Sequence, residues 1–173
     1  PAFAEDVLNS GDTAWIIVST ALVMMMTPAG LALFYGGLVR SKNVLSTVVQ
    51  SFFSLGVVGL IWVLYGYSLA FGPDVGGVIG NLNWAFLDGV GLEPSSDYAT
   101  TVPHIVFCAF QLMFASITPA LITGAFAERV RFVPFVVFSV LWAVFVYNPV
   151  CHWIWSSGGW LGSSRTASPP SRP

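Results

Sequence analysis

Three phenylalanines and one glutamine lie together in a stretch that is otherwise apolar enough for lipid. Phe107, Phe110 and Phe114 are spaced by three and four residues, so on a helix they share one face. Gln111 lies about 100° round the helix from Phe110. An amide without a partner is costly in an apolar environment, so we expect Gln111 to face protein or a cavity. The stripe itself fits either core packing or the wall of a substrate pathway.

A second group of residues that could do chemistry lies near the end of the last apolar segment. Asn148, His152 and Trp155 are spaced by four and three residues, and Pro149 between them would free a backbone carbonyl from the helical ladder. His152 fits either a proton carrier or a histidine that packs and forms hydrogen bonds. Trp155 and its neighbour Trp153 also fit the aromatic belt at a membrane surface.

Other kinds of chemistry find no support in the sequence. His104 and His152 have no second ligand at a spacing that would hold a metal. We find no nucleophile triad, phosphate-binding loop or dinucleotide-binding glycine pattern in a fitting context. Cys108 and Cys151 lie inside apolar runs and predict packing rather than a disulfide framework. The sequence therefore predicts no enzyme, no metal and no cofactor, and the net charge of −2 gives no basic footprint for nucleic acid.

Composition indicates the environment of these groups. Of 173 residues, 55% are hydrophobic and 8% are charged, whereas a water-soluble domain has roughly 25% charged residues. Lipid must therefore cover much of the surface. Four apolar segments exceed the roughly 20 residues that span a bilayer, at about 13–39, 44–71, 101–127 and 132–155. The sequence predicts an all-α, polytopic membrane protein with four transmembrane helices.

The placement of charge predicts the orientation in the membrane. The basic residues before position 162 are Arg40, Lys42, Arg129 and Arg131. They lie in the loops after the first and third spans, so they share one side, which the positive-inside rule makes cytoplasmic. Seven of the eight acids fall on the other side: Glu5, Asp6, Asp12, Asp74, Asp88, Glu93 and Asp97. We expect a multi-pass protein of the cell (inner) membrane with its N-terminus outside.

The two ends of the chain differ from the spans. Residues 1–11 are expected outside the cytoplasm, and Ala2-Phe3-Ala4 fits the small-x-small pattern before a signal-cleavage site. A chance pair of alanines at a trimmed end fits as well. Residues 163–173 contain three prolines and no strong hydrophobe, which predicts either a disordered tail or a shifted reading frame.

Several long blocks resemble the ammonium transporter family (Amt/Mep/Rh). The first span contains TPAGLALFYGGLVRSKNVL at 27–45, and the second ends in YGYSLAFG at 65–72. The third contains AFQLMFASITPALITGAFAER at 109–129, and the fourth contains YNPVCHWIW at 147–155, followed by GGWLG at 158–162. The blocks occur in the family's order, and they mark residues 12–162 as the N-terminal part of an ammonium transporter domain.

The resemblance implies roles for individual residues. Phe114 matches the outer pore phenylalanine, which helps to form the external ammonium site and the gate beneath it, and Trp155 matches the tryptophan that lines that site. Phe110 and Gln111 match positions close to the pore wall, and Tyr35 matches a tyrosine near the conduction pathway. The family mechanism is capture of the ion outside, deprotonation and passage of neutral ammonia, with separate return of the proton making uptake electrogenic. Aromatic faces suit the capture step because they attract cations.

The resemblance also implies an architecture that four spans do not complete. Family members have about eleven spans, as two inverted halves of five and one extra helix, and they form homotrimers. Their substrates are ammonium, ammonia or methylammonium, and a regulator of the signal-transduction (PII) type docks on cytoplasmic parts of many members.

Some family features do not occur in this chain. It lacks the aspartate of the fifth span, both pore histidines, the second gate phenylalanine and the site serine. We therefore expect no ammonium conduction by this chain alone, with Gln111, Asn148 and His152 on exposed surfaces at a cost in lipid. The alternative is a non-conducting ammonium-sensing or accessory membrane module that keeps the outer site.

Overall fold

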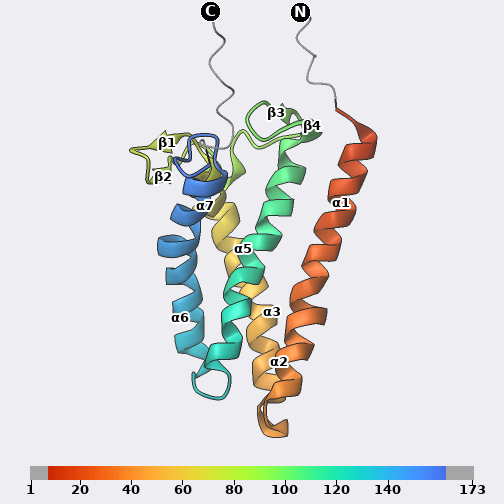
Figure 1. The fold of residues 1–173 in the computed structure, drawn as a ribbon, viewed down its shortest axis with the longest axis vertical. Coiled ribbons are helices and arrows are strands. Elements are labelled where there is room, and N and C mark those ends of the chain that lie inside the picture. Colours follow the sequence, from red (N-terminus) through yellow and green to blue (C-terminus); the bar gives the residue numbers. More distant parts are fainter. Residues whose placement is uncertain (1–7, 163–173) are drawn as a thin grey trace, which may run out of the picture.

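Four long helical rods make up most of the molecule (Figure 1). The computed structural model describes residues 8–162. The rods are Ser10–Leu38, Ser41–Phe71, His104–Phe126 and Phe132–Trp155. All four are long and apolar enough to cross a bilayer, which confirms the polytopic all-α fold predicted from the sequence. The proposed signal remnant at residues 2–4 and the tail at 163–173 lie outside the described residues.

Three of the four rods contain a short π-helical turn. The first rod consists of α1 (Ser10–Met25), the turn Met26–Leu31 and α2 (Ala32–Leu38). The second consists of a 3₁₀ turn (Ser41–Asn43), α3 (Val44–Ile61), the π turn Trp62–Gly66 and α4 (Tyr67–Phe71). The third is the single helix α5 (His104–Phe126), and the fourth consists of α6 (Phe132–Trp142), the turn Ala143–Tyr147 and α7 (Asn148–Trp155).

Prolines lie at two of these π turns. Each turn is closed by an N–H that donates to a carbonyl five residues earlier, as Asn148 does to Ala143. Pro28 lies inside the first turn and Pro149 lies two residues after the third. Because proline has no N–H and interrupts the regular ladder, it favours such a local change of winding.

The loop between the second and third rods folds into two small hairpins at one end of the molecule (Figure 1). β1 (Asp74–Val75) pairs with β2 (Ile79–Gly80), and β3 (Pro94–Ser95) pairs with β4 (Ala99–Pro103). The third rod begins at His104, three residues later than the sequence indicates. The reason is Pro103, because the residue before a proline avoids helical geometry and Val102 therefore stays in β4.

The N-terminal end of α1 is fixed to the same loop. The side chain of Asn9 caps the helix by accepting hydrogen bonds from the N–H groups of Gly11 and Asp12, at 2.8 and 3.1 Å. The N–H of Asn9 donates to the carbonyl of Thr101 in β4 at 2.8 Å. The first rod is thus held beside the start of the third, and α1 and α5 pack together.

The largest buried side chains lie where the second, third and fourth rods meet the loop. Trp62, Tyr67 and Phe71 are fully buried and contact one another through their rings. Cys108 and Cys151 are free, buried thiols in the same cluster, as expected from their apolar surroundings. This core fixes α4, α5 and α7 relative to one another just below the loop.

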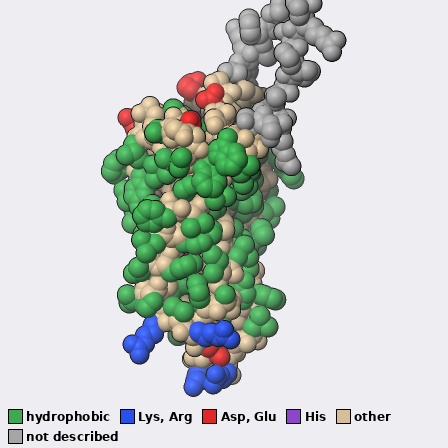
Figure 2. Space-filling view, turned by 60° about the vertical axis from the view of Figure 1, so that its left-hand side comes forward, with side chains coloured by type: hydrophobic (Ala, Val, Ile, Leu, Met, Phe, Trp, Pro, Cys, Tyr) green, Lys and Arg blue, Asp and Glu red, His purple; other side chains and the backbone are tan. Residues whose placement is uncertain are grey.

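The surface of the rods is apolar between two charged ends (Figure 2). We call the end that carries Arg40, Lys42, Arg129 and Arg131 the basic end, and the end with the two hairpins the acidic end. No residue of α1 is buried, and its exposed hydrophobic side chains include Trp15, Ile17 and Leu22. Surface of this kind requires lipid or further protein against it.

At the basic end, Glu128 joins two loops. Its carboxylate accepts hydrogen bonds from the Asn43 amide at 2.9 Å and from the backbone N–H of Arg40 at 2.8 Å, and it forms an ion pair with the Arg40 guanidinium at 3.2 Å. These bonds hold the pKa of Glu128 below its ordinary value, and the hydrogen bond from Asn43 contributes most to this shift. The loop between the first two rods is thereby attached to the end of the third.

Close to Glu128, Tyr35 of α2 lies directly against α5. Its hydroxyl donates to the carbonyl of Leu121 at 2.8 Å. A Cβ added at Gly124 would lie 2.5 Å from the Tyr35 ring, so only glycine allows this approach.

We predict that Gly124→Ala lowers the free energy of unfolding of the chain by about 1–3 kcal/mol, the usual cost of overpacking. The methyl group would displace Tyr35 and break its bond to Leu121. The matched control is Gly56→Ala in α3, where an added Cβ meets nothing within 4 Å and alanine favours the helix. Unfolding in detergent micelles measures both variants, and equal stability of the two would contradict the prediction.

Candidate outer cation site

A cavity of about 430 Å³ opens at the acidic end between the loop, α5 and the end of α7. It is lined by Phe71, Asp97, Tyr98, Phe107, Phe110, Gln111, Phe114 and Trp155. The structure therefore brings together four of the five site residues predicted from the sequence. The fifth, Tyr35, is absent from this cavity.

One face of α5 supplies half of the lining. Phe107, Phe110 and Phe114 point to the same cavity, as their spacing predicts, and Gln111 lies among them. The rings of Phe110 and Phe114 meet edge to face with centroids 5.1 Å apart. Gln111 is half-buried, so its amide faces a cavity, as the sequence indicates.

Trp155 completes the lining from the opposite side, at the last residue of α7. Its side chain is 52% exposed. Among residues 8–162 it makes neither a hydrogen bond nor a ring contact. The ring is thus free to contact a ligand, and its position depends on the backbone that carries it.

Tyr35 lies in a separate cavity of about 370 Å³ towards the basic end, together with Gly124 and Glu128. Its proposed place near the conduction pathway stays a prediction. Within this chain it contacts α5 at a level far from Trp155.

Three lining residues, Phe71, Asp97 and Tyr98, were not proposed as site residues from the sequence. The Tyr98 ring stacks on Phe107, with centroids 5.4 Å apart and planes 15° apart, and it meets Phe71 edge on at 5.2 Å. Asp97 brings a carboxylate to the cavity. The only signal in the sequence is an acid beside an aromatic residue just before the third span.

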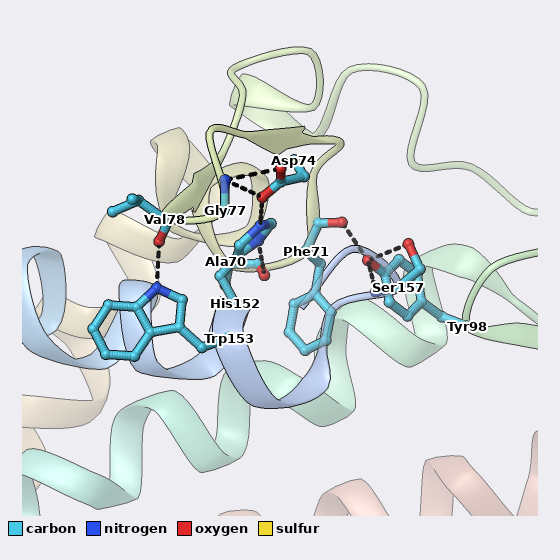
Figure 3. A network of polar contacts seen from close by, with 9 residues as sticks. All are labelled: Ala70, Phe71, Asp74, Gly77, Val78, Tyr98, His152, Trp153 and Ser157. Carbon is cyan, nitrogen blue, oxygen red and sulfur yellow. Dashed lines mark hydrogen bonds and ion pairs between the residues drawn. The ribbon is translucent and has the colours of Figure 1, made fainter. Parts of the chain in front are cut away.

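The hydroxyl of Tyr98 connects two segments that carry the cavity. It donates to the carbonyl of Phe71 at 2.6 Å and accepts from the backbone N–H of Ser157 at 3.2 Å (Figure 3). Burial raises the pKa of Tyr98, so the hydroxyl keeps its proton. The end of α4 and the segment after α7 are both held by this one group.

The expectation that Asn148 and His152 lie on exposed surfaces was wrong. Asn148 is 1% exposed and His152 is 0% exposed. His152 is covered by Ala70 at the end of the second rod and by Asp74 in the loop after it, and both form hydrogen bonds with its ring (Figure 3). This position also favours the reading of His152 as a packing residue with hydrogen bonds.

The lining has the chemistry of a site for a small cation. Aromatic faces attract a cation with about 0.5–2 kcal/mol each, one carboxylate adds its charge, and none of the lining residues is basic. Within residues 8–162, no three His, Cys, Asp or Glu side chains lie close enough to hold a metal ion.

Four apolar rods with an aromatic and acidic cavity at one end define a polytopic helical membrane protein. The model of the Ammonium Transporter Family matches residues 14–168, and the chain belongs to this family. Family members are transporters or channels rather than enzymes.

Similar proteins are much longer than this chain. It is 56% identical over 155 residues to an ammonium transporter of Bacillus subtilis, covering 90% of the chain and 37% of that protein. It is 48% identical to an ammonium transporter of Mycobacterium tuberculosis, covering 92% of the chain and 38% of that protein. The chain thus spans little more than a third of the length of these relatives.

Solved structures agree with this assignment. Mep2 of Saccharomyces cerevisiae superposes with a TM-score of 0.78 at 38% identity, over 88% of the chain and 33% of that protein. Mep2 of Candida albicans gives a TM-score of 0.80 at 34% identity, over 92% of the chain and 34% of that protein. A sensor Amt protein gives a TM-score of 0.74 at 26% identity, over 83% of the chain and 34% of that protein.

We predict that Tyr98→Phe lowers the free energy of unfolding by about 1–3 kcal/mol, because the buried carbonyl of Phe71 loses its partner. The stacked ring is kept, so the loss reports on the hydroxyl. The control is Tyr65→Phe, since the half-buried Tyr65 hydroxyl makes no hydrogen bond among the described residues. Chemical unfolding in micelles measures both, and a Tyr98→Phe variant as stable as the control would exclude this role.

Proposed function

We propose that this chain recruits ammonium from outside the cell and takes part in its transport across the membrane. The observation that carries the proposal is the shared cavity of Phe110, Gln111, Phe114 and Trp155 in a member of the Ammonium Transporter Family. Asp97 at the same cavity supports it, since a carboxylate raises the local concentration of cations.

Capture and gating follow from the lining. Ammonium, like other simple amines in water, is charged at neutral pH, and the face of Trp155 is the strongest aromatic partner for a cation. Phe110 and Phe114 lie beneath as a gate. Moving an ion between two apolar rings is expensive, so the ion gives up its proton and neutral ammonia passes. The proton returns separately, which makes uptake electrogenic.

A closed pathway needs protein beyond the described residues. The cavity is open on one side, and no residue of α1 is buried. We propose that further helices cover these surfaces, in a homotrimer, and that methylammonium is accepted as a substrate. On its own, the chain is expected to bind ammonium without conducting it. The relatives' greater length supports this arrangement.

The proposed orientation has the N-terminus outside the cell and the basic end in the cytoplasm, in the inner membrane. The separation of Arg40, Lys42, Arg129 and Arg131 from the acidic end supports it (Figure 2). A regulator of the signal-transduction (PII) type would then meet the full-length form on its cytoplasmic side.

The second candidate is an ammonium-sensing module that does not conduct. Two observations favour it: the outer cavity forms within residues 8–162, and the chain superposes on a sensor Amt protein. The two candidates share the binding step and differ in uptake.

Uptake of radiolabelled methylammonium tests the proposal. Residues 12–162 replace the corresponding segment of the Bacillus subtilis relative, and the chimera is expressed in cells without their own ammonium transporters. We predict uptake by the chimera, and a KM about 2- to 30-fold higher for Trp155→Leu because one cation–π contact is lost. Trp15→Leu is the control, since Trp15 lies outside this cavity and is exposed on α1.

The outcomes separate the two candidates. A chimera that reaches the membrane and binds methylammonium, but takes up none while the Bacillus subtilis parent does, would favour sensing over transport. Equal KM values for the Trp155 and Trp15 variants would remove Trp155 from the proposed site.

A further inference from the structure

His152 is enclosed by hydrogen-bond acceptors. Its Nδ1 lies 3.1 Å from the carbonyl oxygen of Ala70, and its Nε2 lies 2.9 Å from Oδ1 of Asp74 (Figure 3). The imidazole has no exposed surface. These two partners belong to the end of α4 and to β1, so the ring connects α7 with the segment that leaves the second rod.

The partners indicate which protons the ring carries. A backbone carbonyl only accepts hydrogen bonds, and so does an ionised carboxylate. The hydrogen bonds from His152 and from the N–H of Gly77 hold the pKa of Asp74 below its ordinary value, so its carboxylate is ionised at neutral pH. Each ring nitrogen thus faces an acceptor, an arrangement that a doubly protonated ring satisfies at both nitrogens and a neutral ring at only one.

Asp74 also lies against the turn that follows Trp155. A Cβ at Gly158 would be 2.8 Å from the Cβ of Asp74, so only glycine allows this contact. Asp74 thus contacts the chain on both sides of Trp155, at His152 in α7 and at Gly158 in the turn after it.

A neighbouring contact strengthens the same attachment. The indole N–H of Trp153 donates to the carbonyl of Val78 in the first hairpin at 2.8 Å (Figure 3). On the other side of Trp155, the N–H of Ser157 donates to Tyr98. Since the side chain of Trp155 makes no hydrogen bond or ring contact among the described residues, the position of its ring depends on how these anchors hold the backbone on either side of it.

We propose that Asp74 and His152 form an imidazolium–carboxylate pair that positions Trp155 in the outer cavity. They are positioning residues, because neither lines the cavity. Their effect on capture rests on the function proposed above, whereas the ion pair and its effect on the position of Trp155 do not.

Nitrogen NMR of the full chain in lipid nanodiscs tests the pair. The chain has only two histidines, so His152→Gln assigns the spectrum. We expect both nitrogens of His152 to be protonated at neutral pH, and a neutral ring with one proton in Asp74→Asn, because a buried charge without its partner is costly. The matched control is Asp88→Asn, an exposed acid of the same loop whose carboxylate makes no hydrogen bond among the described residues. A neutral His152 in the unmodified chain would overturn the ion pair.

The position of Trp155 is read from its indole resonance in the same samples, assigned with Trp155→Leu. We expect Asp74→Asn to shift this resonance and Asp88→Asn to leave it in place. An unchanged Trp155 resonance in Asp74→Asn would exclude the positioning role, whatever the state of the histidine.

Uptake by the chimera tests the effect on capture. We expect Asp74→Asn to raise the KM for methylammonium about fivefold with little change in the maximal rate, and to have no further effect when Trp155 is already leucine. Full additivity of the two substitutions would overturn the proposal. If the unmodified chimera takes up no methylammonium, the proposed function fails, and the two NMR readouts still decide the pair and its role.

Discussion

Lipid offers no hydrogen-bond partner, so a hydrogen bond inside the protein stabilises a polar group within the rods. Five hydroxyls in the described spans find such a partner within their own helix. Thr47, Thr118 and Ser139 each donate to the carbonyl four residues earlier, which is the least demanding solution for a short side chain. Ser54 instead donates to the carbonyl of Ser116 at 2.9 Å and so joins α3 to α5. A polar side chain that bonds to its own helix does not affect how the rods pack. One that bonds to a neighbouring rod helps to determine how the two rods meet.

The same constraint shapes the acidic end. α7 carries a buried histidine that lipid would not tolerate, and the loop after α4 folds over it. By covering His152, the loop also fixes the final turn of α7 and with it Trp155. The third rod brings its phenylalanines to the opposite side of the same space. The cavity therefore depends on how the loop covers the ends of α4 and α7. Its most exposed ring, Trp155, is held through contacts that neighbouring residues make.

Much of this arrangement is readable from the sequence. Hydropathy predicts the four rods because a bilayer imposes their length, and the spacing of Phe107, Phe110 and Phe114 predicts their common face. The resemblance to the family adds Trp155, which no periodicity connects to α5. Tyr98 and Asp97 could not be predicted because their place depends on a loop with little regular structure. The pair of Asp74 and His152 joins residues 78 positions apart, and the exposed position expected for His152 was wrong because that loop folds back on α7.

The central claim is that residues 8–162 by themselves assemble a site for a small cation at the acidic end. Titration of the chain in nanodiscs with ammonium chloride, followed by tryptophan fluorescence against a sodium chloride control at equal ionic strength, tests it most directly. We predict a saturable change with ammonium that sodium does not produce and that Trp155→Leu abolishes. A response that is equal for both salts, or that survives the loss of Trp155, would contradict the claim.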